Sequence, residues 1–373
     1  MQHPSDEERL NDPVSTLEVD RRDFRTTRVV AASPTPLEPG QIRLATERFA
    51  LTANNISYAV AGDLLGYWGF FPAEAPWGRI PVMGLSSVAE SAHPDIPTGG
   101  RYFGFTPIAH EVVIRAEPRR NGFRDVGAHR ADHAVFYTDF RDVTTDAMFR
   151  PAQADEYLLL WALFTTAFLA DHHLAGRGFL GARQTVITSA SSKTSISLAA
   201  CLARRPDQRS VGLTSERNRA FVEGLGVYDQ VITYDEVAGL DPSVPSVLVD
   251  MAGSGPVRTA VHTHFADRLA ISLAVGATHW EHGGGGQPLP GPRPEFFFAP
   301  AALAQRSGEP AADDLATRLT GAFHEFLDGA SRWLTVEHHS GIGEVEAVYR
   351  ALLDGRVDPS VGHVLAMRRG VLS

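Results

Sequence analysis

The sequence predicts an α/β protein in which a β-rich first part precedes a parallel sheet covered by helices on both faces. From about residue 155 onward, short apolar segments alternate with helical segments of about ten residues, a rhythm typical of repeated βαβ units. Before that point, proline and glycine separate short runs of β-branched and aromatic residues, which predict strands. The chain has 373 residues, more than one compact core usually holds, so two domains are expected.

The first part contains four segments that predict strands, namely IRLATERFAL, IPVMGLSSVAES, GGRYFGF and AHEVVIRAE. The apolar run from Tyr157 to Ala170 follows it. This run is shorter than the roughly 20 residues that a membrane-spanning helix needs, so we expect a buried helix.

The second part supplies the parallel sheet. Its predicted strands are TVITSAS, SVGLTS, QVITYDEV, SVLVDMAG and RLAISLAVG, and the helices between them include ISLAACLARR, ERNRAFVEGLG and VRTAVHTHF. The last part contains the aromatic run FFFAP, helices around ATRLTGAFHEFLDGASRWL and GEVEAVYRALLDG, and a strand-like VGHVLAM.

Composition and charge narrow the function classes. The net charge of -10 argues against nucleic-acid partners, because such binding depends on cationic contacts to phosphates. The N-terminus is charged and lacks the apolar centre of a signal peptide, so export is not expected. The only cysteine, Cys201, lies on the apolar face of a predicted helix and fits core packing in a reducing cytoplasm. We expect a cytoplasmic protein with no membrane partner.

The turn from Ile187 to Ser195 reads ITSASSKTS and joins a predicted strand to a predicted helix. Dinucleotide-binding βαβ units carry glycines at such turns, for the tight bend and for close approach to the pyrophosphate. The helix N-terminus still offers amides and its positive dipole end to an anion, and a lysine adds charge. We predict phosphate contacts from Ser189, Ser191, Ser192, Lys193 and Thr194. The alternative is a closed loop whose serines only cap the helix.

The next strand indicates which dinucleotide would bind. An acidic side chain at its end would bind the ribose 2′-hydroxyl of NAD, whereas an arginine would accommodate the extra phosphate of NADP. This strand ends in Thr214 and Ser215, and Arg217 follows. These residues favour NADP(H), although Glu216 and Arg217 could equally form a solvated first helical turn.

The order of a β-domain, a nucleotide fold and a return segment ending in a strand resembles the medium-chain dehydrogenase/reductase superfamily. The likeness is to its zinc-independent, quinone-oxidoreductase-like branch, and to a poorly characterised bacterial side family of that branch. It covers about residues 40 to 373 and is carried by GGRYFGFTPIAHEVVIRAE and by EVEAVYRALLDGRVDPSVGHVLAM.

The resemblance implies a division of the chain and an assembly. The expected parts are a flexible N-terminal arm over residues 1–30, a GroES-like catalytic domain over 31–154 and 332–373, and a Rossmann-like nucleotide-binding domain with a doubly wound sheet over 155–331. It further implies that Asp250 ends a strand where the backbone passes beneath the cofactor. A homodimer formed through the nucleotide domain, with FFFAP at the contact, is also implied.

Zinc is not expected at the catalytic centre. The zinc-dependent branch carries a cysteine ligand and a later Gly-His-Glu, and Asn55, Leu85 and Ser86 take those positions here. An amide, an alkyl group and a hydroxyl are poor substitutes for zinc ligands. Histidine pairs such as His338 and His339 lack acidic partners at a spacing typical of metal sites, so no metal is predicted.

Asn54, Asn55 and Tyr58 are the candidate catalytic residues. A tyrosine can donate a proton, and an asparagine amide can polarise a carbonyl. An equally weighted alternative is that Asn54 and Asn55 mark a turn and that Tyr58 packs in an aromatic core. A weaker candidate is the group His279, Trp280 and His282, which follows a strand of the sheet.

The leading hypothesis is an NADP(H)-dependent, zinc-independent oxidoreductase that reduces a small carbonyl or activated alkene. In it, Asn55 orients the acceptor, and Tyr58 or a water provides the proton. One alternative is a lyase or isomerase that uses tyrosine and histidine proton transfer, with the cofactor absent or not consumed. Another is a nucleotide-sensing protein without catalysis.

Overall fold

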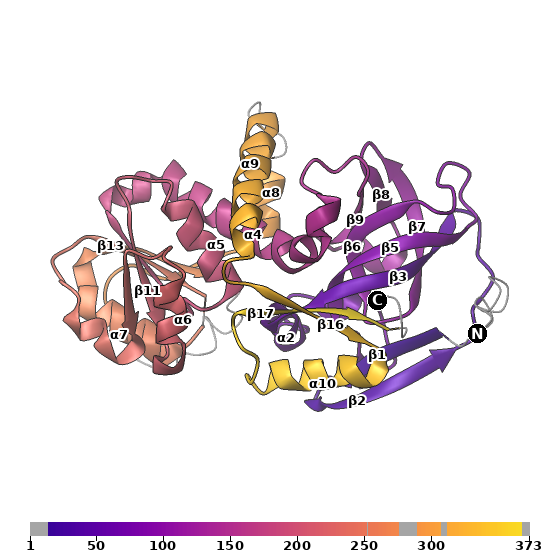
Figure 1. Ribbon diagram of the computed structural model, residues 1–373, viewed down its shortest axis with the longest axis horizontal. Helices are drawn as coiled ribbons and strands as arrows, with labels where there is room; N and C mark the ends of the chain where they lie inside the picture. The colour runs from indigo at the N-terminus through magenta and orange to yellow at the C-terminus, as the bar shows by residue number, and fades with distance from the viewer. Residues whose placement is uncertain (1–13, 252, 276–288, 307–311, 368–373) are drawn as a thin grey trace. The chain divides into compact units, whose positions relative to one another are not determined.

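The computed structural model describes residues 14–251, 253–275, 289–306 and 312–367. The chain forms two compact units, one made of residues 1–159 and 335–373 and the other of residues 160–334 (Figure 1). The boundaries expected from the sequence lie at residues 154 and 331.

The first unit is built on an eight-stranded sheet in the order β16-β17-β3-β5-β6-β9-β8-β7. Its central strands are β3 (Gln41–Leu51), β5 (Pro81–Ser91), β6 (Arg101–Pro107), β7 (Glu111–Arg119), β8 (Gly122–Asp125) and β9 (Asp139–Asp142). Because β3 also pairs with β7, six strands close into a ring around a core that includes Ile42, Val88 and Phe140. The four predicted strands of this part, β3, β5, β6 and β7, are confirmed.

A hairpin precedes the barrel. Strands β1 (Val14–Asp20) and β2 (Asp23–Ala32) pair with each other and with β4 (Trp77–Gly78). The prediction of a flexible arm over residues 1–30 is therefore wrong for residues 14–30. The hairpin is ordered because Leu17 and Val19 are buried in a core shared with α10 (Ile342–Leu353), which lies beside β1 and β2 in Figure 1.

The return segment adds two strands to the same sheet. Strands β16 (Thr335–Ser340) and β17 (Val361–Ala366) run parallel and are connected by α10, and β17 pairs antiparallel with β3. The strand over VGHVLAM was predicted. Its partner β16 was not, because its polar residues hide the alternation of a strand.

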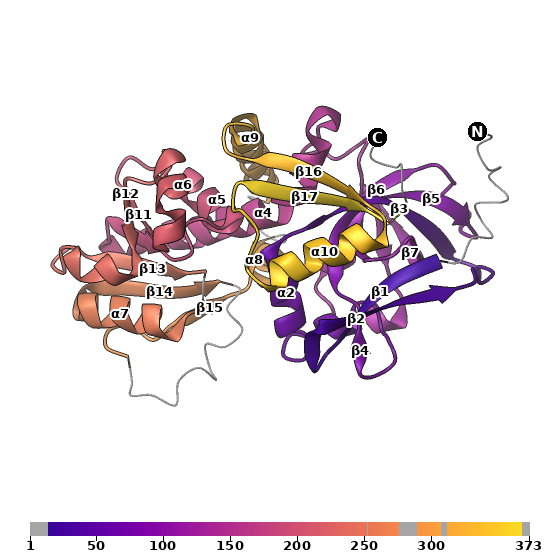
Figure 2. The ribbon, with the colours of Figure 1, turned by 60° about the horizontal axis from the view of Figure 1, so that its bottom comes forward.

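The second unit contains a six-stranded parallel sheet in the order β12-β11-β10-β13-β14-β15. Its strands are β10 (Gln184–Ile187), β11 (Arg209–Thr214), β12 (Gln230–Thr233), β13 (Ser246–Asp250), β14 (Leu269–Val275) and β15 (Glu295–Phe297). Figure 2 shows α7 (Gly255–Phe265) on one face of the sheet and α5 (Lys193–Leu202) and α6 (Arg219–Gly224) on the other. The strand order reverses between β10 and β13, which is the switch point of a doubly wound sheet.

Three further helices are α4 (Ala154–Gly176), α8 (Ala299–Arg306) and α9 (Ala312–Ala330), of which α4 and α9 are long. With 23 residues, α4 is longer than the predicted apolar run, and among the described helices it alone is long and apolar enough to cross a membrane. However, 67% of its apolar window is buried inside the protein. Core helices of soluble proteins have the same property, so the helix is weak evidence for a membrane span.

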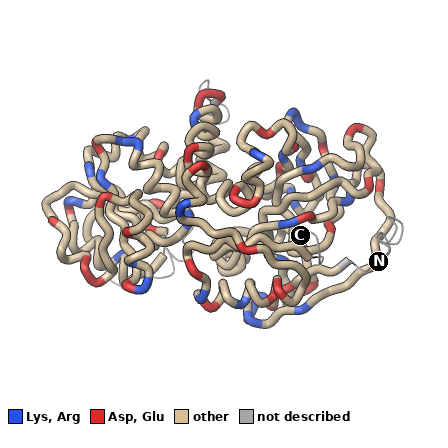
Figure 3. Tube along the Cα trace, in the orientation of Figure 1, with Lys and Arg blue, Asp and Glu red and all other residues tan. Residues whose placement is uncertain are grey.

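Charged residues of both signs are interspersed along both units (Figure 3). Many of them pair, as where buried Arg43 contacts Glu90 at 3.0 Å and Glu111 at 2.9 Å. Much of the charge therefore forms local ion pairs and does not create a continuous surface of a single sign.

Candidate functional site

The predicted phosphate loop lies between β10 and α5, and its serines form two kinds of hydrogen bond. Ser192 is the N-cap of α5, and its Oγ accepts a hydrogen bond from the backbone N–H of Ser195 at 3.2 Å. The Ser195 hydroxyl donates to the carbonyl of Thr188 at 2.9 Å. Ser192 therefore caps the helix, as the alternative expects, whereas Ser195 lies inside the helix and holds the turn through the Thr188 carbonyl.

Ser189 keeps the shape of the turn. Its φ of 49° lies in the left-handed region that glycine adopts readily, and its carbonyl accepts the Ser192 N–H at 2.7 Å. A side chain in this conformation costs about 1–2 kcal/mol. The chain thus retains at Ser189 the tight bend that a glycine would give, in spite of the strain.

Thr188 and Asp250 meet at the switch point between β10 and β13. The Thr188 hydroxyl donates to Asp250 Oδ1 at 2.8 Å and accepts the backbone N–H of Met251 at 2.8 Å. Asp250 is buried, also accepts the Gly253 N–H at 3.1 Å, and lies 3.5 Å from Arg258. These contacts make Asp250 a positioning residue that ties the two loops together.

The end of β11 lies against the same loop. Thr214 is the buried last residue of β11, Ser215 follows half-buried, and Arg217 is exposed in the short 3-10 helix Glu216–Asn218. Asn218, which the sequence analysis missed, donates from Nδ2 to Ser191 Oγ at 3.0 Å. The structure therefore brings all the predicted cofactor residues to the carboxyl ends of three adjacent strands, β10, β11 and β13.

The groups that remain accessible in the loop are suited to an anion. Ser191, Lys193 and Thr194 are half-buried, and Lys193 is the only lysine in the sequence. The first turn of a helix leaves its amides without intrahelical acceptors, and Thr194 lies in that turn. A phosphate held here would meet backbone donors, hydroxyls and one cation.

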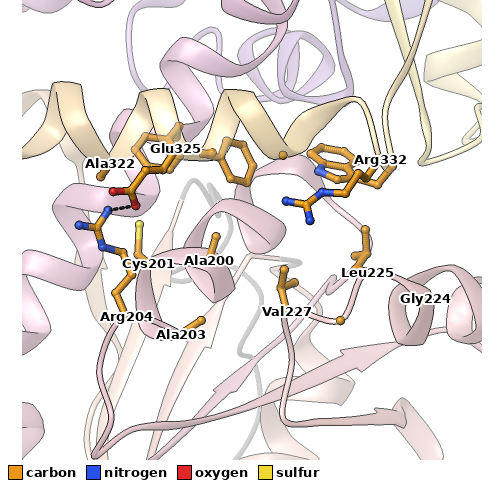
Figure 4. A pocket seen from close by; sticks show the side chains of 15 residues that line it. Ala200, Cys201, Ala203, Arg204, Gly224, Leu225, Val227, Ala322, Glu325 and Arg332 are labelled. Carbon is orange, nitrogen blue, oxygen red and sulfur yellow. Dashed lines mark hydrogen bonds and ion pairs between the residues drawn. The ribbon is translucent and has the colours of Figure 1, made fainter.

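A cavity of about 420 Å³ lies elsewhere in this unit, at the C-terminal end of α5 (Figure 4). Arg204 and Glu325 form an ion pair of 2.9 Å along its lining. Burial raises the pKa of the Cys201 thiol there, which keeps it protonated and unreactive. None of the predicted cofactor residues lines this cavity, so it is separate from the loop.

In the first unit, the predicted catalytic residues lie on α2 (Ala53–Val60), where the sequence suggested a turn. Asn55 is buried; its Oδ1 accepts the Thr52 N–H at 2.8 Å, and its Nδ2 donates to the carbonyl of Pro81 at 2.9 Å. Both ends of the amide are thus engaged within the protein. Asn55 anchors α2 to β5, and these contacts correct the expected role of orienting an acceptor.

Tyr58 lies one turn further along α2 and is 9% exposed. Burial raises the pKa of its hydroxyl well above the ordinary value, and the neighbouring Asn54 side chain acts in the opposite direction. Its ring contacts Tyr67 and Phe105, with centroid distances of 4.8 Å and 5.8 Å. The aromatic packing that the alternative interpretation expected is therefore present, together with a polar partner.

Two further tyrosines extend this cluster. The hydroxyls of Tyr67 and Tyr137 lie 3.3 Å apart, and both side chains are buried. Arg130 fixes the surrounding backbone by donating to the carbonyls of Phe70 at 3.1 Å and Tyr137 at 2.6 Å. Burial lowers the pKa of Arg130 to about 10, although Asp125 lies 3.2 Å away. Sequence reasoning missed these partners, because Tyr137 and Arg130 are far from Tyr58 along the chain.

The positions of the zinc ligands in the zinc-dependent branch hold no ligand set here. Leu85 and Ser86 are buried residues of β5, and Asn55 is occupied as described. The weaker candidates His279, Trp280 and His282 lie outside the described residues.

A closed β-domain joined to a doubly wound parallel sheet, with a polar loop at its switch point, defines the fold of the medium-chain dehydrogenases and reductases. The chain has this fold, and it belongs to the family described as "Protein of unknown function (DUF2855)", which matches residues 49–358. Among curated proteins, none matches the sequence.

Solved structures share the fold over nearly the whole chain. The YhdH oxidoreductase from Salmonella enterica, in complex with NADP, is 14% identical with a TM-score of 0.57, covering 95% of this chain and 100% of its own. CurA from Vibrio vulnificus, in complex with NADPH, is 12% identical with a TM-score of 0.55, covering 95% and 99%. The quinone oxidoreductase from Coxiella burnetii is 12% identical with a TM-score of 0.52, covering 95% and 100%.

Proposed function

We propose that this protein is an NADP(H)-dependent oxidoreductase that reduces a small carbonyl or activated alkene without a catalytic zinc. The observation that carries the proposal is the glycine-like turn at Ser189, which leads into the N-terminus of α5 beside Lys193 at the switch point of the sheet. Similar folds described with NADP and NADPH, and as a quinone oxidoreductase, support it.

The loop residues fit a dinucleotide by the chemistry of their donors. Ser191, Lys193 and Thr194 would hold the pyrophosphate, because they offer hydroxyls, an amide and a cation. Thr214, Ser215 and Arg217 would take the 2′-phosphate, since no carboxylate ends β11 to repel it. When bound, the cofactor supplies the hydride that reduces the electrophilic carbon.

The tyrosine cluster supplies the polar group for the substrate oxygen. A phenol with a raised pKa stays protonated and donates a hydrogen bond more readily than it releases a proton. We therefore assign Tyr58 the stabilisation of the developing negative oxygen, with Asn54 holding its hydroxyl in place. Water delivers the proton. The positions of Asn55, Leu85 and Ser86 support chemistry without zinc.

Lys193→Ala tests the cofactor site. Loss of a charge-assisted hydrogen bond costs about 1.5–3 kcal/mol, so the Kd for NADPH should rise by about tenfold or more. NADPH fluorescence titration measures this change. Arg183→Ala is the matched control, because it removes one exposed cation at the opposite end of β10; its Kd should equal that of the wild type.

Two results would contradict the proposed function. One is wild-type protein that binds neither NADPH nor NADH. The other is a Lys193→Ala variant whose affinity for NADPH is unchanged.

A further inference from the structure

Two histidines and a glutamate converge on the return segment of the first unit. Glu337 and His339 lie two residues apart on β16, and therefore on the same face of the strand. His363 lies on β17, directly opposite Glu337 in the parallel register. Figure 2 shows β16 and β17 side by side. No metal site was expected here from the sequence, because His363 is 24 residues from His339 along the chain.

The three ligand atoms have the separations of a coordination site. His339 Nε2 lies 3.0 Å from His363 Nδ1, and Glu337 Oε2 lies 3.7 Å from each of these nitrogens. A point equidistant from three such atoms is about 2.0 Å from each, which matches the Zn–N and Zn–O distances of roughly 2.0–2.2 Å. A metal ion could therefore bind with little movement of the side chains.

We propose that Glu337, His339 and His363 bind a zinc ion, with water as the fourth ligand. Two imidazoles and one carboxylate form a ligand set that zinc uses in proteins when one position is left to solvent. His363 is buried and would fix the site, whereas Glu337 is exposed and His339 half-buried, which gives the ion a path from solvent.

Neighbouring groups suit this role for His339. Glu344 Oε2 lies 4.0 Å from His339 Nδ1 and accepts the backbone N–H of Ser340 at 2.7 Å. A carboxylate that hydrogen bonds to a histidine ligand orients the ring and raises its basicity, and the exposed Glu344 side chain would form such a bond after a small shift toward His339. The bound ion would join β16 to β17, so it would stabilise the folded state selectively. This inference does not depend on the proposed redox function.

The neighbouring His338 provides the control. It alternates to the other face of β16, where its Nε2 lies 2.8 Å from Asp155 Oδ2. Asp155 is also 3.2 Å from Arg48, so His338 belongs to a separate ion-pair group.

The proposal is tested by calorimetric titration. Full-length protein is first stripped of metal with a chelator and is then titrated with Zn²⁺. The wild type should bind Zn²⁺ saturably and show a higher Tm with the ion. Glu337→Gln and His339→Ala should each weaken this binding by tenfold or more and lose the Tm shift. His338→Ala should behave as the wild type. Both ligand variants change side chains that are not fully buried, and circular dichroism checks that they fold.

Cobalt gives an independent signal. Co²⁺ bound by these ligands should show the visible absorption of a four-coordinate ion, and His339→Ala should abolish it. The proposal is overturned if the wild type takes up neither ion saturably, or if Glu337→Gln and His339→Ala bind Zn²⁺ as the wild type does.

Discussion

Tyr58 illustrates how burial alters what a side chain can do. Burial raises the pKa of its hydroxyl, so the phenol stays neutral and can donate a hydrogen bond. The proposed role assigns that hydrogen bond to the substrate oxygen.

Tyr58→Phe should lower the kcat of NADPH-dependent carbonyl or enone reduction by about 100-fold, as loss of one preorganised oxyanion donor does in other enzymes. Steady-state oxidation of NADPH measures it. Tyr349→Phe is the matched control, since Tyr349 is also buried with a raised pKa and its hydroxyl donates to the carbonyl of Phe24 at 2.8 Å. Unchanged activity in the Tyr58→Phe variant would remove the tyrosine from the mechanism.

At the residue scale, the sequence predicted the turn between β10 and α5 but not the different contacts that its serines make. Ser189 adopts the left-handed backbone conformation, while the side chains of Ser192 and Ser195 form hydrogen bonds at the start of α5. The contact between Ser191 and Asn218 joins residues 27 positions apart. A local pattern cannot reveal such a contact, because it depends on the pairing of β10 with β11.

At the scale of elements, α2 is a helix where the sequence predicted a turn. Two asparagines predicted a turn, yet Thr52 and Asn55 form a capping box that starts a helix. The same residue types favour turns and helix N-termini, so the following apolar residues and their burial decide between them.

Asn55→Ala should lower the free energy of unfolding by about 2 kcal/mol. Loss of the cap contributes about 1 kcal/mol, and leaving the Pro81 carbonyl unpaired contributes about as much again. Urea denaturation measures the change. Ser57→Ala, at an exposed position of the same helix, should leave stability nearly unchanged. A variant at Asn55 as stable as the wild type would show that the anchor to β5 is dispensable.

The strands β1 and β16, which the sequence did not predict, both contain many polar residues. In β1, the buried residues Leu17 and Val19 alternate with polar ones, including Glu18, and in β16 all but one residue is polar. Glu18 is itself buried, held by Arg28 at 2.7 Å and Arg79 at 2.9 Å. Hydropathy alone gives no sign of a buried carboxylate, because its burial depends on two distant arginines.

On the scale of the whole molecule, the order of elements was predictable because βαβ periodicity is local and repeated. Identities of 12–14% with proteins of the same fold show that the order of elements persists where individual residues do not. Packing across the chain, such as that of α10 on the β1–β2 hairpin, was not predictable from such periodicity.

Stability of the molecule should fall as the pH drops from about 7 toward about 5. Burial lowers the pKa of His262, whose Nδ1 lies 2.9 Å from the Pro290 carbonyl and whose Nε2 lies 2.8 Å from Ser272 Oγ. The unfolded chain takes up a proton near pH 6.5 while the folded state resists it, so stability present above that pH is lost below it. Burial lowers the pKa of His129 and His133 in the other unit as well.

Thermal unfolding across this pH range measures the effect. His262→Gln, which keeps an amide able to hydrogen bond but does not titrate, should flatten the dependence of Tm on pH. If the Tm of the variant depends on pH as steeply as that of the wild type, His262 is excluded as a source of the pH dependence.

The single lysine of the chain has a practical consequence. A protease specific for lysine can cut this chain at one peptide bond only, at the start of α5. Because that bond lies in a helix, cleavage requires the helix to open locally, and its rate reports the free energy of that opening. Limited proteolysis therefore measures how readily the candidate phosphate loop opens. The rate at which the two fragments appear reports the free energy of that opening.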